Sequence, residues 1–329
     1  MSIFVILCSC NGERYISRQI ESILEQTEPG VRLLISDDCS TDRTAEIAEG
    51  FARLHPDRIQ VFRRETPSGG AARHFLSTLS RVMRGRVADL PDYLLFSDQD
   101  DVWHPDKVQK TLNVMRREEH VSGTALPILV HCDMRVTDDA GNVISPSYVR
   151  YQQMSPERNH LNELLVQNNV TGGAMMMNRA LARLIAAHPV PEHAVMHDQW
   201  IALAAAAFGR VVFFDKALYD YRQHGDNVLG AAKGSRVREV ADRLGLFRRD
   251  KKTKADMDLH SRRVYDALFL QAGEFYLQYG RELSPRNREI LTAFLALPKM
   301  GRPEKIRTIL KYGFTFNRLH RTVGECLFL

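Results

Sequence analysis

Short apolar runs alternate with segments of helical periodicity through the first 230 residues or so of the chain. The runs are bounded by polar residues, as buried strands are, and cover 3–7, 31–35, 58–63 and 93–96. Between them apolar residues recur at helical spacing, as Ile16, Ile20 and Ile23 do before the Pro29-Gly30 stop. This alternation predicts an α/β fold with a doubly wound, mostly parallel central sheet flanked by helices.

The strand and helix pattern continues through the second half of this region and ends near residue 228. Strands are expected at 128–136 and 210–214, and the stretch 172–187 is typical of a strand followed by a helix. Beyond residue 228, charged and apolar residues alternate at helical spacing without a further strand pattern. We therefore expect a sheet-containing domain over 1–228 and a basic, mainly helical C-terminal extension over 229–329.

Charge is divided unevenly between these two parts. Residues 1–228 hold 24 Lys and Arg against 29 Asp and Glu, whereas residues 229–329 hold 21 against 11. The basic tail interleaves cations with apolar side chains such as Leu310, Phe314 and Phe316. Such a segment is either a solvated helical face or one that lies on an anionic membrane surface. It carries no motif that reads nucleic acid, so we expect no nucleic-acid partner.

Other features of the composition indicate a cytoplasmic protein. No apolar run approaches the roughly 20 residues of a membrane span. The start of the chain lacks a basic region and a cleavage site, so it is expected to form the first strand rather than a signal peptide. Cys8 and Cys10 have no second pair that would complete a zinc site, which favours reduced thiols. Peripheral binding to the inner face of the membrane stays open.

Three acids follow the strand at 93–96: Asp98, Asp100 and Asp101, with only Gln99 between them. The carboxyl ends of parallel strands form the edge at which open α/β sheets bind ligands. Carboxylates this close repel one another unless a cation lies among them, and oxygen ligands suit Mg²⁺ or Mn²⁺. The alternative for these residues taken alone is a solvated acidic turn before the next helix.

Two further segments carry candidate chemistry. His197 and Asp198 precede an Ala-rich helix, where Asp198 is either a helix cap or a general base set apart in sequence from the acidic cluster. Gly69 and Gly70 precede another helix, where their backbone N–H groups can approach a phosphate or simply form a turn.

Four motifs in this order resemble glycosyltransferase family 2, which has the GT-A fold, and within it the bacterial polysaccharide rhamnosyltransferase-like branch. They are CNGERY at 10–15, DDCSTD at 37–42, DQDDVW at 98–103, and HDQW at 197–200 followed by YRQHGDN at 221–227. Each motif alone is weakly specific, but four in register across about 200 residues are a strong signal.

The resemblance implies roles for individual residues. Nucleotide binding would fall to Ser9, Asn11, Glu13, Asp38, Arg73, Asp98 and His224. Asp100 would ligate Mg²⁺ or Mn²⁺ directly, with Asp98 and His224 beside the ion. Asp198 matches the position of the family's catalytic base. His74 stands where the family often has Asn, so no role is carried over to position 74.

The function that this resemblance implies is inverting sugar transfer. The donor would be a dTDP- or UDP-sugar, with rhamnose suggested by the branch. The acceptor would be a saccharide, free or carried on polyprenyl diphosphate, in the synthesis of bacterial surface polysaccharide. The alternatives are another UDP-sugar donor and a non-catalytic carbohydrate-binding protein on a transferase scaffold. A dinucleotide-dependent oxidoreductase is excluded because residues 8–13 hold a single glycine in place of Gly-x-Gly-x-x-Gly.

Overall fold

The computed structural model describes residues 1–85, 90–224 and 251–317, with the backbone alone over 251–261. In this part of the chain the strands form one nine-stranded sheet, in which β7 (Val143–Ser145) pairs only with β6. The path through the other strands is β3 (Ile59–Arg63), β2 (Val31–Asp37), β1 (Ile3–Ser9), β4 (Tyr93–Ser97), β8 (Met175–Asn178), β6 (Ile128–Thr137), β9 (Arg210–Arg222) and β5 (Val102–Trp103).

The first four strands of this path are parallel. Strand β8 runs antiparallel between β4 and β6, and β6 and β9 are parallel to each other. The prediction of a mostly parallel α/β sheet is therefore confirmed. The chain leaves β1 toward β2 on one side and returns to β4 on the other, which makes a topological switch point at the carboxyl ends of β1 and β4. The predicted motifs follow these two strands.

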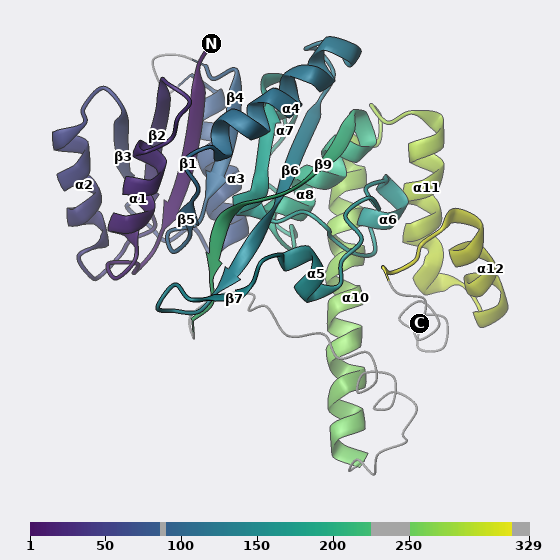
Figure 1. Cartoon of the computed structure of the whole chain (residues 1–329). Helices are drawn as coiled ribbons and strands as arrows, with labels where there is room; N and C mark the ends of the chain where they lie inside the picture. Colours follow the sequence, from purple (N-terminus) through teal and green to yellow (C-terminus); the bar gives the residue numbers. More distant parts are fainter. Residues whose placement is uncertain (86–89, 225–250, 318–329) are drawn as a thin grey trace.

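Helices cover both faces of the sheet (Figure 1). Because side chains alternate along a strand, Ile3, Val5 and Leu7 of β1 face one hydrophobic core, and Phe4 and Ile6 face the other. The first core is closed by α1 (Ile16–Leu24), α2 (Thr44–Leu54) and α4 (Lys107–Ser122). The second is closed by α3 (Ala71–Met83), α7 (Arg179–Ala187) and α8 (His197–Phe208).

Two short helices lie between β7 and β8: α5 (Tyr148–Gln152) and α6 (Leu161–Leu164), followed by the 3₁₀ turn η1 (Gly172–Ala174). Strand β9 is longer than the 210–214 prediction. Its exposed Asp215 and Lys216 interrupt the apolar pattern, while its pairing with β6 continues beyond register shifts near Asp133. Such irregularities bend a strand, and here they carry β9 on to Arg222, beside the ends of β1 and β4.

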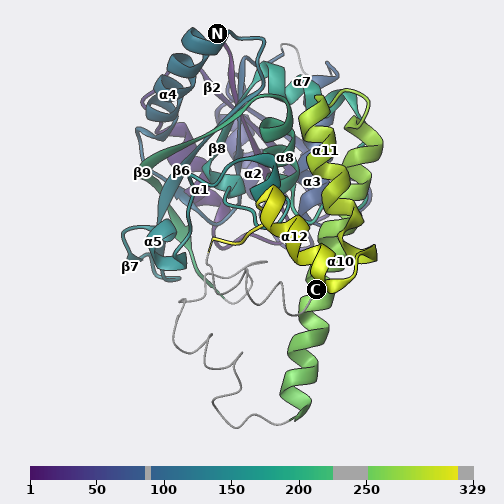
Figure 2. The same cartoon turned by 90° about the vertical axis from the view of Figure 1, so that its right-hand side faces the viewer.

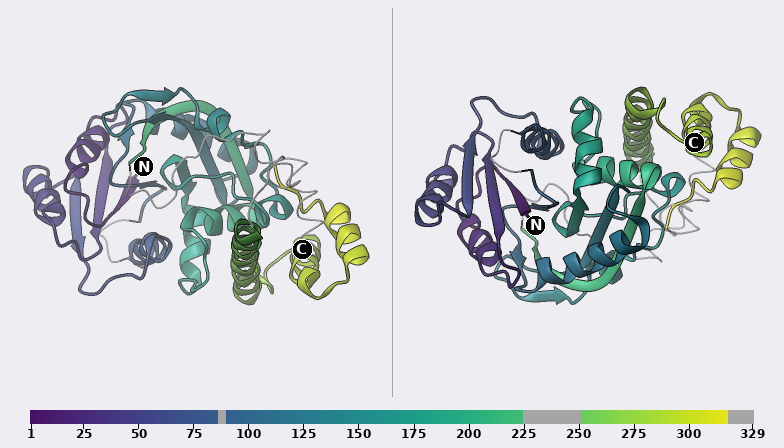
Figure 3. Two further views of the ribbon diagram at one scale, coloured as in Figure 1. Left: turned by 90° about the horizontal axis from the view of Figure 1, so that it is seen from below. Right: turned by 90° about the horizontal axis from the view of Figure 1, so that it is seen from above.

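The C-terminal segment is helical as expected, with α10 (Lys251–Tyr279), α11 (Pro285–Ala296), the 3₁₀ turn η2 (Leu297–Lys299) and α12 (Arg302–Tyr312). These helices lie at the end of the molecule far from α2 (Figures 2 and 3). The Trp200 ring of α8 packs 5.3 Å from Phe275 and 6.1 Å from Tyr279, so α10 shares a core with the sheet domain. The predicted boundary at 228/229 lies outside the described residues.

The apolar side chains of the tail pack mostly inward. Phe314 is fully buried and Phe316 packs against the same core, whereas Leu310 is 66% exposed. Phe314 therefore does not contribute to a membrane-facing surface, because its ring fills space beside Phe294 at a centroid distance of 5.3 Å, while membrane binding by the segment as a whole stays a prediction. The basic run at 248–254 and residues from 318 onward lie outside the described side chains. No described helix is long and apolar enough to cross a bilayer.

Candidate functional site

The loops that follow β1 and β4 are joined by the side chain of Gln99. Its Oε1 accepts a hydrogen bond from Cys10 N at 2.9 Å, and its Nε2 donates to Cys10 O at 3.0 Å. A Cβ atom on Gly12 would lie 2.2 Å from Gln99 Oε1, so position 12 has no room for a side chain while this link is made. Sequence patterns do not single out Gln99, because its role depends on β1 and β4 being neighbours.

Three of the side chains expected to contact the nucleotide form hydrogen bonds within the protein. Asn11 Oδ1 accepts a hydrogen bond from Thr41 N at 2.8 Å, and Glu13 Oε2 accepts one from Arg43 N at 2.9 Å. Ser9 is buried, with its Oγ 3.4 Å from Asp37 Oδ1. These contacts hold the loop between β2 and α2 against the loop after β1. Direct contact of these three residues with a nucleotide stays a prediction.

Asp38 lies at the end of β2 and is held by two polar neighbours. Its carboxylate accepts hydrogen bonds from Ser68 N at 2.7 Å and Ser68 Oγ at 2.6 Å, and it pairs with Arg64 Nε at 3.2 Å. Arg73, the expected nucleotide-binding cation, is exposed on the first turn of α3 and makes no hydrogen bond or ion pair with the described residues. The cation beside Asp38 is thus Arg64, which the motif comparison missed.

His74 is buried beside the Asp38 group. Its Nε2 lies 2.9 Å from Ser36 Oγ, and burial lowers the pKa of the imidazole. The glycine pair before it adopts φ values of 89° at Gly69 and 130° at Gly70, which L-residues rarely take. The turn itself accounts for both glycines, and a phosphate contact is not needed to explain them.

The acids after β4 are close enough to Asp198 to interact electrostatically. Burial, followed by the charges of Asp100 and Asp198, raises the pKa of Asp98 to about 7. Asp101 is only 2% exposed, and burial and then Asp100 and Asp98 raise its pKa as well. A solvated acidic turn does not describe a carboxylate this buried. Gly172 N donates to Asp198, and a Cβ on the next residue, Gly173, would lie 3.0 Å from Asp101 Oδ2, so the acids after β4 and Asp198 lie at the same edge of the sheet.

Asp198 lies in the first turn of α8 and is 8% exposed. Its carboxylate accepts hydrogen bonds from Gln199 N at 2.6 Å, Asn168 Nδ2 at 2.9 Å and Gly172 N at 3.1 Å. Burial nevertheless raises the pKa of Asp198 to about 7. A carboxylate held in fixed orientation with a pKa near neutrality is suited to general base chemistry.

The neighbouring His197 explains why position 172 is glycine. The imidazole is 2% exposed, stacks on Phe75 at 4.1 Å, and neither of its ring nitrogens hydrogen bonds to a described residue. Burial lowers the pKa of His197 to about 3, so the ring is neutral. A Cβ on Gly172 would lie 2.3 Å from His197 Nε2. Only glycine lets the backbone pass between His197 and Asp198.

The end of β9 lies over the acidic residues. His224 Nε2 lies 2.7 Å from Asp100 Oδ2, and the His224 ring stacks on Tyr15 at 4.6 Å. Arg222 Nε donates to Asp100 O at 3.1 Å, and its Nη1 donates to Asp139 O at 2.7 Å. The structure thus places His224 against Asp100, and its expected contact with the diphosphate or the metal ion stays a prediction.

A buried lysine lies behind the acids. Lys107, at the start of α4, is fully buried; its Nζ donates to Gly173 O and lies 3.7 Å from the centre of the Trp103 ring. Burial lowers the pKa of Lys107 to about 8, while Asp101 and Asp98 act in the opposite direction. Sequence reasoning missed Lys107, because only the packing of α4 under the site shows that its ammonium is turned inward.

The donor set fits a divalent cation that also binds substrate oxygens. Asp98, Asp100 and Asp101 crowd negative charge at one edge, and two of them have raised pKa values for that reason as well as burial. Within the described residues, no three His, Cys, Asp or Glu side chains are grouped closely enough to hold a metal ion. Mg²⁺ commonly takes one or two carboxylates and completes its shell with water and phosphates, so a partial protein site is the expected form.

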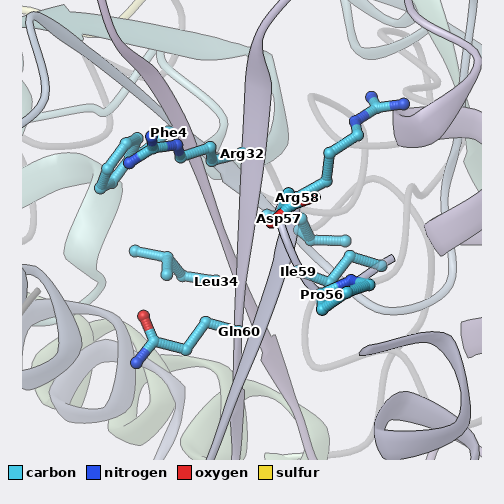
Figure 4. A pocket seen from close by; sticks show the side chains of 9 residues that line it. Phe4, Arg32, Leu34, Pro56, Asp57, Arg58, Ile59 and Gln60 are labelled. Carbon is cyan, nitrogen blue, oxygen red and sulfur yellow. The ribbon is translucent and has the colours of Figure 1, made fainter. Parts of the chain in front are cut away.

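A separate cavity of 360 Å³ lies at the amino ends of β1, β2 and β3 (Figure 4). Phe4, Arg32 and Gln60 are among its lining residues. None of the predicted site residues contributes to it, because they follow the carboxyl ends of the strands.

Comparison with known proteins agrees with the motif order. The sequence model described as "Glycosyl transferase family 2" matches residues 4–184. The chain is 35% identical over 109 residues to the dTDP-rhamnosyl transferase RfbG of Shigella flexneri, covering 33% of this chain and 36% of RfbG. It is 26% identical over 254 residues to the uncharacterized glycosyltransferase alr2836 of Nostoc sp., covering 75% of this chain and 72% of that protein.

A solved structure resembles nearly the whole chain. The S. aureus TarS 1–349 structure in complex with UDP-GlcNAc superposes with a TM-score of 0.57 at 18% identity, covering 95% of this chain and 80% of TarS 1–349. At this identity the likeness concerns the fold. The matched part of RfbG is about a third of its length, so the activity of that whole protein does not transfer directly to this chain.

Proposed function

Because the chain belongs to glycosyl transferase family 2, we propose that it transfers a sugar, with inversion, from a pyrimidine-nucleotide donor to a saccharide acceptor. The observation that carries this proposal is the pairing of two kinds of carboxylate at one sheet edge. Asp98 and Asp100 follow β4, and the separately held Asp198 begins α8 near enough to raise the pKa of Asp98. A non-catalytic scaffold would have no need to keep such mutually repelling groups.

The nucleotide base is assigned to the ends of β1 and β2. Asp38 is oriented there by Ser68 and Arg64, and a carboxylate can accept the imide N–H that uracil and thymine share. The proposal is supported by the names of two similar proteins: TarS is bound to UDP-GlcNAc, and RfbG is a dTDP-rhamnosyl transferase. The RfbG match favours a dTDP-sugar, with rhamnose as the first candidate.

The donor's diphosphate is assigned to the edge formed by Asp98, Asp100 and His224. Asp100 would hold Mg²⁺ or Mn²⁺, with Asp98 and His224 beside the ion, and the ion, when bound, supplies positive charge to the departing nucleoside diphosphate. Arg222 holds the Asp100 backbone, and Gln99 fixes the same loop to Cys10. The chain's own contribution is therefore to keep the acidic loop in one position relative to the loop after β1.

Asp198 is the proposed general base. It accepts the proton of the acceptor hydroxyl as that oxygen forms a bond to the anomeric carbon, and the bond from the anomeric carbon to the diphosphate oxygen breaks. Asn168 and Gly172 hold the carboxylate by hydrogen bonds while this occurs. One base acting on the acceptor fits a single displacement, which inverts the anomeric configuration; dTDP-β-L-rhamnose would give an α-linked rhamnoside.

The acceptor is proposed to belong to a bacterial surface polysaccharide, and the basic C-terminal part to bring the enzyme to an anionic membrane that carries it. The first experiment is a donor panel of dTDP- and UDP-sugars incubated with the full chain and Mn²⁺. We expect thermal stabilisation and slow hydrolysis with pyrimidine nucleotide sugars and neither with GDP-mannose. A preference for GDP-mannose would contradict the donor assignment, and no response to any nucleotide sugar would contradict the proposed function.

A further inference from the structure

An aromatic pair lies beside the site on the side away from Asp38. Tyr148 opens α5 and Tyr221 lies near the end of β9; their rings meet edge to face, with centroids 5.7 Å apart and an interplanar angle of 71°. Both rings are partly buried against the core on the α4 face of the sheet. The mechanism described above uses neither side chain.

The position of Tyr148 is fixed by a buried carboxylate. Asp133 of β6, 2% exposed, accepts hydrogen bonds from Ser147 Oγ at 2.5 Å and Val149 N at 3.1 Å. These two donors stand on either side of Tyr148 in the chain. Ser147 Oγ in turn accepts a hydrogen bond from Arg150 N at 3.1 Å and so caps α5. The first turn of this short helix is thereby tied to the sheet.

The pair lies at the acidic edge of the site, because Tyr221 directly precedes Arg222, whose Nε donates to Asp100 O at 3.1 Å. After burial, the charge of Asp198 raises the pKa of the Tyr148 phenol. After burial, Asp101, Tyr148, Asp98 and Asp100 raise that of Tyr221. Tyr221 lies on β9, and α5 with Tyr148 is tied to β6 through Asp133, whereas Asp38 follows β2 on the other side of β4. In the order of the strands, the acids that follow β4 therefore lie between the proposed site of the nucleotide's base and the two tyrosines.

The Tyr148 hydroxyl forms no hydrogen bond with any residue that the structure describes. Tyr148 is partly buried, and its hydroxyl is not one of the buried polar atoms that lack a partner, so this oxygen is accessible to a ligand. Ligand sites combine aromatic walls with a few placed polar groups. The Tyr148 ring, which packs against Tyr221 at the acidic edge and has an accessible hydroxyl, has both properties.

We propose that Tyr148 and Tyr221 form the acceptor subsite, and that it takes a pyranose ring of a saccharide. The apolar face of the sugar lies against the aromatic pair, and the reacting hydroxyl is positioned between the Tyr148 hydroxyl and the Asp198 carboxylate. This assignment rests on the proposed function and deepens it, because it names the wall that recognises the acceptor. Tyr148 is a specificity-determining residue in this account, with Asp133 holding it in place.

The test compares Tyr148→Phe, Tyr148→Ala and the matched control Tyr151→Ala, all in the full chain. Tyr151 stands on the same short helix and has not been assigned to the site. The probes are methyl pyranosides of common hexoses and 6-deoxyhexoses, offered with the best donor from the panel. Acceptor KM, kcat and the dissociation constant of the donor's nucleoside diphosphate are measured for each protein.

We expect Tyr148→Phe to raise the acceptor KM about fivefold, as the loss of one neutral hydrogen bond does. Tyr148→Ala should lower kcat/KM for the acceptor about 30-fold or more, since the ring is lost as well. The nucleotide dissociation constant should stay within about twofold in both, and Tyr151→Ala should match the wild type. An unchanged acceptor KM in Tyr148→Ala would overturn the subsite.

Other outcomes separate this inference from the proposed function. If the wild type hydrolyses the donor but no pyranoside is glycosylated or suppresses that hydrolysis, the subsite is contradicted and the transferase assignment is not. If the wild type neither binds nor hydrolyses any nucleotide sugar, the proposed function itself fails. If Tyr148→Ala and Tyr151→Ala lose acceptor use equally, α5 has only a structural role, and the assignment of Tyr148 is wrong.

Discussion

At the scale of single residues, the chemistry of the site depends on how burial changes the protonation of carboxylates. Asp98, Asp101 and Asp198 all have raised pKa values, with burial as the first cause. The family resemblance singled out Asp98, Asp100, Asp198 and His224, which the structure places near one edge of the sheet, and their roles there stay predictions. The resemblance did not single out Lys107, Arg64 or Gln99, whose partners are distant in sequence and become neighbours only through the sheet order.

The raised pKa of Asp198 predicts a pH dependence of transfer. A general base works as the carboxylate, so kcat should rise about tenfold per pH unit below pH 7 and level off above it. Asn168→Leu removes a hydrogen bond to the carboxylate at 2.9 Å, and should move the midpoint upward by about one pH unit. The measurement is kcat at saturating substrates between about pH 5.5 and 8.5. A midpoint that does not move in Asn168→Leu would assign the titration to another group, such as Asp98.

At the scale of elements, periodicity in the sequence predicts which helices and strands form, but it does not predict where they end. The apolar alternation predicted β1 to β4 and the helices between them, because each buries a regular stripe. It failed for β5, which has only two residues, and for the second half of β9, where exposed Asp215 and Lys216 hide a strand that pairs with both β6 and β5. Pairing partners rather than local propensity determine such segments.

The contact between η1 and α8 gives a prediction at this scale. Gly172→Ala would place a Cβ 2.3 Å from His197 Nε2, and the stacked ring has little room to move. We expect Gly172→Ala to lower the free energy of unfolding by about 1–3 kcal/mol. It should also weaken the Gly172 N–H bond to Asp198. Urea denaturation measures the stability, and Gly50→Ala in α2, where the nearest atom to a Cβ is 3.9 Å away, is the control.

The double variant Gly172→Ala/His197→Ala tests the cause of this effect. Removing the ring relieves the close approach, so the added cost of Gly172→Ala should vanish in the His197→Ala background. If Gly172→Ala costs the same in both backgrounds, then the contact with His197 is not the reason for glycine at position 172.

At the scale of the whole molecule, the sheet order and the shared core decide where the site forms and how the parts hold together. The mostly parallel sheet could be predicted from the sequence, but the antiparallel insertion of β8 between β4 and β6 could not. A run of methionines predicts a buried strand without showing its orientation relative to the neighbouring strands. Likewise, helical periodicity predicted the C-terminal helices without showing that Phe275 and Tyr279 would pack on Trp200.

The shared core predicts that the sheet domain and the C-terminal helices unfold together. Phe275 is fully buried against Trp200, so Phe275→Ala should lower the free energy of unfolding by about 3–5 kcal/mol. The unfolding curves from tryptophan fluorescence and from circular dichroism should remain coincident. Leu277→Ala, at an 84% exposed position on the same helix, should cost little. Two separate transitions would indicate that the helices form an independent unit.

The proposed transfer depends on Asp198 as the general base, while other residues bind the nucleotide. The most direct test is Asp198→Asn, assayed for sugar transfer and, by calorimetry with Mn²⁺, for binding of the donor's nucleoside diphosphate. We predict that transfer falls by about 10²–10⁴-fold, while the nucleotide dissociation constant changes by less than about threefold. Transfer within about tenfold of the wild type, with nucleotide binding intact, would show that another group removes the proton and would contradict the assignment.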